Sequence, residues 1–295
     1  MPHHLAQLAL VNKKVFYDLL FRASAETLLQ VARDPEHLGA QIGFFSVLHS
    51  WGQNLLFHPH IHCVIPSGGL SPDGTRWIHP RYPFFLPVGV LSCVFRGKFV
   101  DALKRRFQQR QLIFPGSLRP LQNEKAFRAF LRPLFRQNWV VYAKPPFGGP
   151  HHVLGYLARY THRVAITNHR LVAFENNQVT FRWKDYAHGN HKRMMTLSAQ
   201  EFLRRFLLHV LPRGFVRIRS FGFLANRCRA TLLPRCQRLL LDNPRPPALS
   251  PLPYTPATPA CFRCPKCATL MLRVEFLSAW EAGQLISRSA LLDSS

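Results

Sequence analysis

Histidines at alternate positions form the first pattern in the chain that could do chemistry, in the run His58-Pro59-His60-Ile61-His62. Alternate side chains of a β-strand project from the same face, so His60 and His62 would present two imidazoles together. Two imidazoles can hold a divalent ion, and a third side chain and phosphate oxygens can complete its coordination. A polar strand facing solvent is the alternative interpretation of so short a motif. We predict a metal site at His60 and His62, with Gln53 or His49 as the third ligand.

Two tyrosines four residues apart form the second pattern. Tyr156 and Tyr160 would lie one turn apart on the same face of a helix, so both hydroxyls could reach one phosphate. A tyrosine is a useful nucleophile for DNA strand transfer, because the phosphotyrosine ester conserves the energy of the broken phosphodiester bond. An aromatic pair packed in the core is the alternative. The basic neighbours Arg159 and Arg163 favour the catalytic interpretation, since they could offset phosphate charge.

The charge of the chain points to a polyanionic partner. Lys and Arg number 39 against 14 Asp and Glu, giving a formal net charge of +25. Between Tyr156 and Arg235 the excess is concentrated, with 15 basic residues and three acidic ones. Basic residues interleaved with aromatic ones suit phosphate contacts and base stacking. We predict that DNA is contacted by Arg159, Arg163, Arg182, Lys184, Arg217 and Arg219. So few carboxylates argue against a two-metal site built on an acidic triad.

Hydrophobic periodicity and turn-forming residues predict the elements that position these side chains. Two neighbouring strands are expected at 42–48 and 61–65, and the histidines lie on the second. A strand at 139–143, a break and a new helix at 151–162 would carry the tyrosines. The other predicted elements are helices at 12–32, 89–109 and 123–137, a hairpin of strands 171–174 and 179–183, and helices beginning at Ser198 and Leu224.

The C-terminal part of the chain has a different composition. Seven prolines in 16 positions predict an extended linker at 244–260, between a main domain at 1–243 and a tail at 261–295. Cys261, Cys264 and Cys267 supply three of the four ligands that structural Zn²⁺ requires, and a knuckle without metal is the alternative. The other cysteines are scattered, and no secretory signal or long apolar stretch occurs, so a reducing cytoplasm is expected.

Taken together, these motifs resemble the two-tyrosine HUH transposases of rolling-circle insertion sequences. The resemblance rests on four segments in the expected order: His49 to Leu55, His58 to Gly69, Tyr156 to Ile166, and Gly222 to Arg227. It implies an α+β HUH endonuclease core, an antiparallel sheet flanked by helices, that nicks and joins single-stranded DNA. It also implies that His60 and His62 bind Mg²⁺ or Mn²⁺ and that Tyr156 and Tyr160 are the nucleophiles. The expected partners are single-stranded DNA at the ends of a mobile element and target DNA, in a bacterial cytoplasm.

Members of this family usually carry an N-terminal cysteine-rich zinc module followed by a first core strand. Neither precedes the segments above, so we expect an N-terminally truncated copy whose activity could be impaired. Two alternatives use the same residues: a rolling-circle replication initiator or relaxase, and a catalytically dead DNA-binding remnant. The sequence leaves open the order in which the two tyrosines act, the DNA sequences recognised and the oligomeric state.

Overall fold

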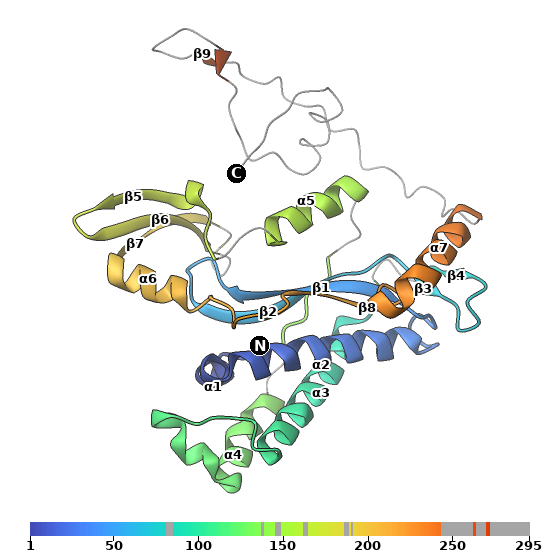
Figure 1. Cartoon of the computed structure of the whole chain (residues 1–295), viewed down its shortest axis with the longest axis horizontal. Coiled ribbons are helices and arrows are strands. Elements are labelled where there is room, and N and C mark those ends of the chain that lie inside the picture. Colours follow the sequence, from blue (N-terminus) through green and yellow to red (C-terminus); the bar gives the residue numbers. More distant parts are fainter. Residues whose placement is uncertain are drawn as a thin grey trace.

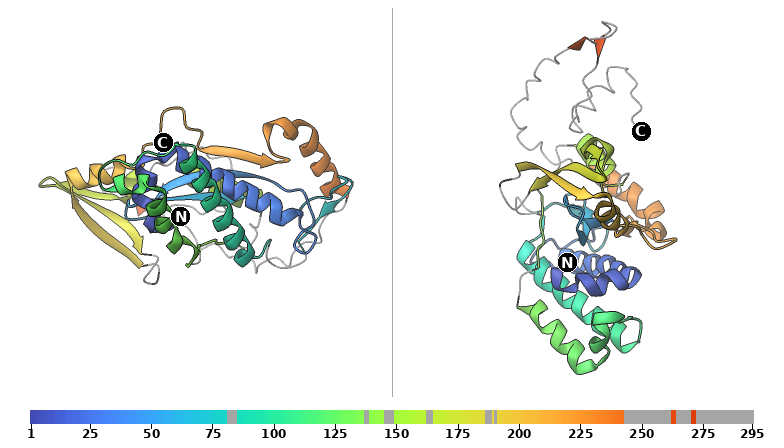
Figure 2. Two further views of the ribbon diagram at one scale, coloured as in Figure 1. Left: turned by 90° about the horizontal axis from the view of Figure 1, so that it is seen from below. Right: turned by 90° about the vertical axis from the view of Figure 1, so that its left-hand side faces the viewer.

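The computed structural model describes residues 1–80, 85–136, 139–144, 149–161, 165–185, 189, 191–242, 262–263 and 270–271. Its architecture is α+β, with antiparallel sheets flanked by helices, as predicted. Helix α5 (Pro150–Thr161) lies over one face of the central sheet, and the N-terminal helices lie against the other face (Figures 1 and 2). The central sheet is therefore the middle layer, between the predicted tyrosine helix and the hydrophobic core.

Three antiparallel strands form the central sheet. Strand β1 (Gly43–Trp51) pairs on one side with β2 (Phe57–Val64) and on the other with β8 (Ile218–Gly222). The predicted pairing of the first two strands is confirmed. The sequence analysis treated residues 217–221 only as a basic and aromatic surface and missed β8. In the structure Phe221 of β8 stacks on Phe44 of β1, with ring centroids 5.4 Å apart.

A close approach of two backbones at the end of β8 requires glycine at position 222. Gly222 has φ of +60°, and a Cβ there would lie 1.8 Å from the carbonyl oxygen of Ile42. We expect Gly222→Ala to lower the free energy of unfolding by about 3 kcal/mol, from backbone strain and forced displacement. Urea unfolding measures this change. Gly97→Ala in helix α3 is the matched control, because its Cβ would meet no atom within 4 Å and should stabilise the helix by about 1 kcal/mol. Equal stability of the two variants would contradict the expectation.

The helical layer contains α1 (Ala6–Val11), α2 (Lys13–Arg33) and α3 (Val88–Gln108). The second and third helices agree with the predicted ranges. Phe16 of α2 and Phe99 of α3 are fully buried against each other, with ring centroids 6.1 Å apart. Removal of this apolar surface from water supplies the main stabilisation of the layer. This helical layer packs against one face of the central sheet and supports it.

The predicted helix at 123–137 is shorter in the structure. Helix α4 (Glu124–Leu131) follows the 3₁₀ segment η2 (Gly116–Gln122), and the side chain of Asn123 caps it by accepting hydrogen bonds from two backbone amides. The helix then gives way to a 3₁₀ turn, η3 (Arg132–Phe135). Pro133 explains the change, because proline lacks the N–H that would continue the α-helical bonding.

The predicted strand at 139–143 is wrong, since residues 139–144 form no strand. Trp139 holds the start of this segment through its main chain and its side chain. The carbonyl of Trp139 accepts a hydrogen bond from Ser92 Oγ (2.6 Å), and the Trp139 indole donates to the carbonyl of Leu134 (3.1 Å). The segment is therefore anchored beside α3, and it leads toward the tyrosine helix.

A second antiparallel sheet contains β5 (Leu171–Glu175), β6 (Gln178–Asp185) and β7 (His191–Ser198), followed by α6 (Ala199–Leu207). The predicted hairpin is confirmed as β5 and β6. Strand β7 was missed because most of its side chains are exposed and show no apolar alternation. Arg170 joins the two sheets: its guanidinium donates to the carbonyl of Arg182 (2.7 Å) and to that of Gln53.

The remaining elements lie beyond these layers. Strands β3 (Gly69–Leu70) and β4 (Trp77–Ile78) form a small ribbon beside α7 (Asn226–Asp242). Cys261, Cys264 and Cys267 lie outside the described residues, and so does the proline-rich segment. Two short strands, β9 (Phe262–Arg263) and β10 (Leu270–Met271), pair with each other. The division at 243 and 260 stays a prediction. In the described part of the chain, no helix is long and apolar enough to cross a membrane.

Candidate metal and tyrosine site

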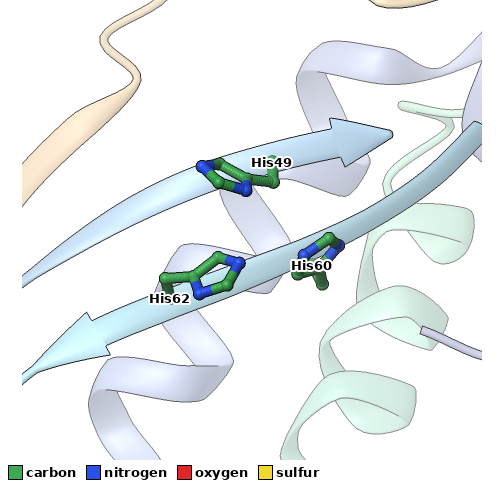
Figure 3. A group of neighbouring side chains, drawn as sticks. All are labelled: His49, His60 and His62. Carbon is green, nitrogen blue, oxygen red and sulfur yellow. The ribbon is translucent and has the colours of Figure 1, made fainter. Parts of the chain in front are cut away.

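Three histidines from adjacent strands meet on the face of the central sheet toward α5. His49 of β1 pairs in register with His60 of β2, and His62 follows two residues later on the same face (Figure 3). Candidate ligand atoms of the three rings all lie within 4.8 Å of one another. These three side chains would be the ones to hold a divalent transition ion, for which imidazole is a common ligand.

A hydrogen bond to the main chain fixes the tautomer of His60. Its Nδ1 lies 2.7 Å from the carbonyl oxygen of His58. Because a carbonyl can only accept, Nδ1 must carry the proton, and Nε2 keeps its lone pair. Histidine ligands in metal sites are typically oriented by such a bond from the other ring nitrogen. His60 therefore already has the protonation pattern of a metal ligand.

Burial keeps the histidine pair neutral. Desolvation, and secondarily the charge of His62, lowers the pKa of His60 to about 3. Desolvation, together with the nearby Lys144 ammonium, lowers the pKa of His62 to about 4. Only neutral imidazole can bind a metal ion. Both rings are therefore ready to act as ligands at neutral pH.

These low pKa values predict a pH-dependent stability for the metal-free protein. In the unfolded chain His60 and His62 would take up protons below about pH 6.5, whereas in the folded protein they stay neutral to far lower pH. The unfolded state then binds more protons, so the free energy of unfolding falls as the pH decreases from about 6.5 toward 4. We expect a lower urea midpoint at pH 5 than at pH 7 in the presence of a chelator. The difference between the urea midpoints at pH 7 and pH 5 should be smaller in His60→Gln/His62→Gln. An unchanged difference would contradict this explanation.

The hydroxyl of Tyr156 reaches the histidine cluster. Tyr156 lies on α5, and its oxygen is 2.6 Å from Nδ1 of His62. The sequence placed the tyrosine and the histidine 94 residues apart, and only the crossing of α5 over the sheet brings them together. A phenol oxygen that contacts an imidazole beside a potential metal site can be activated as a nucleophile. Tyr160 is on the same helix, but its side chain is outside the described part of the structure.

Two residues near this site were not singled out by the sequence. The Nζ atom of Lys144 is 5.7 Å from the centroid of the Tyr156 ring, and its positive charge favours an anionic phenol oxygen. Trp51 stacks on His49, with ring centroids 4.7 Å apart and an interplanar angle of 15°. Trp51 does occur in the histidine-containing segment, but its contact depends on the pairing of the strands. Lys144 gave no signal beyond its position before a proline-rich break.

The other predicted site residues are spread over several surfaces. Gln53 lies in the turn after β1, where its carbonyl accepts a bond from Arg170; its role as a metal ligand stays a prediction. Arg182 and Lys184 are exposed on β6, as a DNA-contacting role requires. The side chain of Arg159 and all of Arg163 lie outside the described residues.

Arg217 and Arg219 have structural contacts at β8. The Arg219 guanidinium is 2.5 Å from the Asp18 carboxylate and lies 4.3 Å from the centroid of Phe21, both on α2. It thus faces the core layer, away from the histidines. Burial lowers the pKa of Arg217, whose carbonyl accepts a hydrogen bond from the Leu48 amide (3.0 Å). The predicted DNA contacts of both arginines stay predictions.

The chain matches a known protein family. The family model described as "Y2_Tnp: Putative transposase" matches residues 43–231, which include all three histidines and both tyrosines. The chain belongs to this transposase family. The resemblance to two-tyrosine HUH transposases found in the sequence is thereby confirmed.

Two relatives place the chain within the family. It is 58% identical over 240 residues to "Putative transposase y4qJ" of Sinorhizobium fredii (strain NBRC 101917 / NGR234), covering 81% of this chain and 60% of the relative. It is 28% identical over 279 residues to "Transposase for insertion sequence element IS801" of Pseudomonas savastanoi pv. phaseolicola, covering 88% of this chain and 62% of the relative. The chain thus spans about 60% of the length of these relatives. No solved structure matches the chain.

Proposed function

We propose that the chain is a DNA transposase that nicks and joins single-stranded DNA through a tyrosine nucleophile beside a histidine-held metal ion. One observation carries the proposal: the Tyr156 oxygen is 2.6 Å from a histidine whose ring belongs to a three-histidine cluster. This contact favours the catalytic interpretation over a tyrosine packed in the core, because a core tyrosine would not be expected to contact a group of candidate metal ligands. Family membership supports transposition over origin nicking, because both relatives are named as transposases.

The donor set fits a divalent transition ion. His49, His60 and His62 offer three imidazole side chains, and imidazole suits such ions better than it suits Mg²⁺, which prefers oxygen ligands. Of the two predicted ions, Mn²⁺ therefore matches these residues better. When bound, the ion would polarise the scissile phosphate and offset the charge that develops on it.

Tyr156 is the nucleophile in this proposal. The phenol releases its proton to solvent and its oxygen attacks the phosphorus. The bond from phosphorus to the 3′ oxygen breaks, and that oxygen takes a proton from water to become a free 3′-hydroxyl, while the 5′-phosphate stays on the tyrosine. If His62 binds the ion through Nε2, its Nδ1 carries a proton and donates to the phenol oxygen, which favours the phenolate. Lys144 favours the same form by its charge. A later 3′-hydroxyl reverses the steps and joins the strands.

The second tyrosine and the basic surface complete the proposal. Tyr160, one turn after Tyr156, would hold a second DNA strand, so that two ends can be exchanged. Arg182 and Lys184 on β6 would contact the phosphate backbone of the bound strand, in a region whose sequence is strongly basic. The tail cysteines Cys261, Cys264 and Cys267 would hold a structural Zn²⁺.

End-labelled oligonucleotides test this function. The protein is incubated with Mn²⁺ and single strands carrying the ends of an insertion sequence, labelled at either the 5′ or the 3′ end. A covalent adduct that retains only the 3′ label is expected, followed by transfer of the strand to a target oligonucleotide. Nicking and resealing without transfer would favour a replication initiator or relaxase. Salt-sensitive binding without an adduct would indicate a DNA-binding remnant.

A further inference from the structure

A groove between α3 and α4 lies on the side of the molecule away from the histidine cluster. It has a volume of about 330 Å³, and its apolar lining consists of Leu131 and three phenylalanines, Phe107, Phe127 and Phe135. Figures 1 and 2 show α4 beyond α2 and α3, whereas α5 covers the opposite face of the central sheet. A ligand in this groove would therefore not touch the tyrosine site.

Basic side chains form the rim of the groove. Lys104, Arg128 and Arg132 line it together with a single carboxylate, Glu124. That carboxylate is already paired with Arg128, at 2.5 Å. Neither Lys104 nor Arg132 forms a salt bridge within the described residues, so two exposed positive charges are left for an anionic ligand.

An aromatic ring stands among these charges. Phe135 is 47% exposed, which is unusual for phenylalanine, and the ammonium of Lys104 lies 5.7 Å from its ring centroid. The guanidinium of Arg96 lies 6.0 Å from the same centroid and donates to the Phe135 carbonyl (3.3 Å). Aromatic rings beside cations are the typical elements of a surface for unpaired nucleotides, where bases stack and phosphates meet positive charge.

We propose that the groove between α3 and α4 is a second binding site for single-stranded DNA, in which Phe135 stacks a base and Lys104 and Arg132 contact phosphates. The inference rests on the proposed DNA substrate but not on the tyrosine chemistry. The bases of a duplex are already stacked on one another, so a duplex would offer no free base face to the Phe135 ring. The site would hold a strand, or a part of the strand, other than the one at Tyr156.

Oligonucleotide binding by charge-matched variants of the whole chain tests the site. Lys104→Glu/Arg132→Glu removes the two groove cations, and Lys14→Glu/Arg33→Glu makes the same charge change on exposed positions of α2. Binding of a fluorescent oligothymidylate is followed by anisotropy in a chelator while the salt concentration is raised. The groove variant should lower the slope of log affinity against log salt by about 1.4, since each phosphate contact on a single strand contributes about 0.7. The control should keep the wild-type slope.

Phe135→Ala tests the stacking without changing charge. We expect about tenfold weaker binding of the single strand and unchanged binding of a duplex of equal length. Photocrosslinking of an iodouracil oligonucleotide should label peptides from α4 and η3 in the wild type, and the groove variant should lose this label. The proposal is overturned if the groove and control variants bind alike, or if Phe135→Ala affects duplex and single strand equally. A further outcome separates the two proposals. If the groove variant loses the α4 label that the wild type shows, while the wild type forms no covalent adduct, the groove site is supported and the tyrosine chemistry is refuted.

Discussion

Replacing both His60 and His62 by alanine is expected to reduce metal-dependent nicking of single-stranded DNA at least about 10³-fold. The two rings are neutral and lie on one face of β2, and their candidate ligand atoms lie within 4.8 Å of that of His49. Their loss removes the ion, whose stabilisation of transition-state charge amounts to several kcal/mol, and each 1.36 kcal/mol is a factor of ten in rate. Initial nicking rates with Mn²⁺ measure the effect, and calorimetric titration measures the accompanying loss of Mn²⁺ affinity.

His58→Ala is the matched control for this prediction. His58 precedes the pair on the same strand, but it contributes its main-chain carbonyl, which the substitution leaves in place. Nicking should therefore remain near the wild-type rate. The third ligand is decided by single variants: His49→Ala should weaken Mn²⁺ binding at least about tenfold, and Gln53→Ala should leave it unchanged. An equal effect of His58→Ala, or a larger effect of Gln53→Ala, would contradict the assignment.

Tyr156→Phe is expected to abolish the first covalent adduct, with a loss of at least about 10³-fold in the rate of its formation. The substitution removes one oxygen, the atom that lies 2.6 Å from His62. The ring and its contact with Lys144 are kept, so the position of α5 should not change. Gel analysis of denatured protein with labelled DNA follows the adduct.

Two other tyrosine variants make this result specific. Tyr142→Phe changes a tyrosine that is 76% exposed and lies before the break that leads to α5, and it should form the adduct as the wild type does. Tyr160→Phe should still form the first adduct and fail only in the joining of a second strand. If Tyr160→Phe loses the first adduct while Tyr156→Phe keeps it, the assigned order of the two tyrosines is wrong.

The histidine site shows what a local pattern can and cannot predict. Period-two spacing on a strand was enough to place His60 and His62 on one face. The choice between His49 and Gln53 was open, because it depends on the register of β1 against β2. That register is set by the short connection between the strands, where Leu55 has φ of +60° and its carbonyl is held by buried His209 (3.0 Å). No spacing rule encodes such a long-range contact.

The tyrosine helix and the third strand show the same limit. Helical spacing predicted the range of α5 closely, but the contact from Tyr156 to His62 depends on how that helix crosses the sheet. Strand β8 was missed because its residues are basic and aromatic, and its partner β1 lies far away in the chain. Conversely, the false strand at 139–143 had suitable residues and no neighbouring strand to pair with. Strand propensity becomes structure only when a partner edge is available.

Mass spectrometry of the DNA-linked peptide tests the central claim most directly. The whole chain is incubated with a single-stranded substrate and Mn²⁺, digested, and searched for nucleotide attached to tyrosine. The structure predicts a 5′-phosphotyrosine at Tyr156 as the first product, present with Mn²⁺ and absent with chelator. Nucleotide attached to any residue outside α5, or an adduct that forms equally well with chelator, would contradict a tyrosine nucleophile that works beside a histidine-held metal ion.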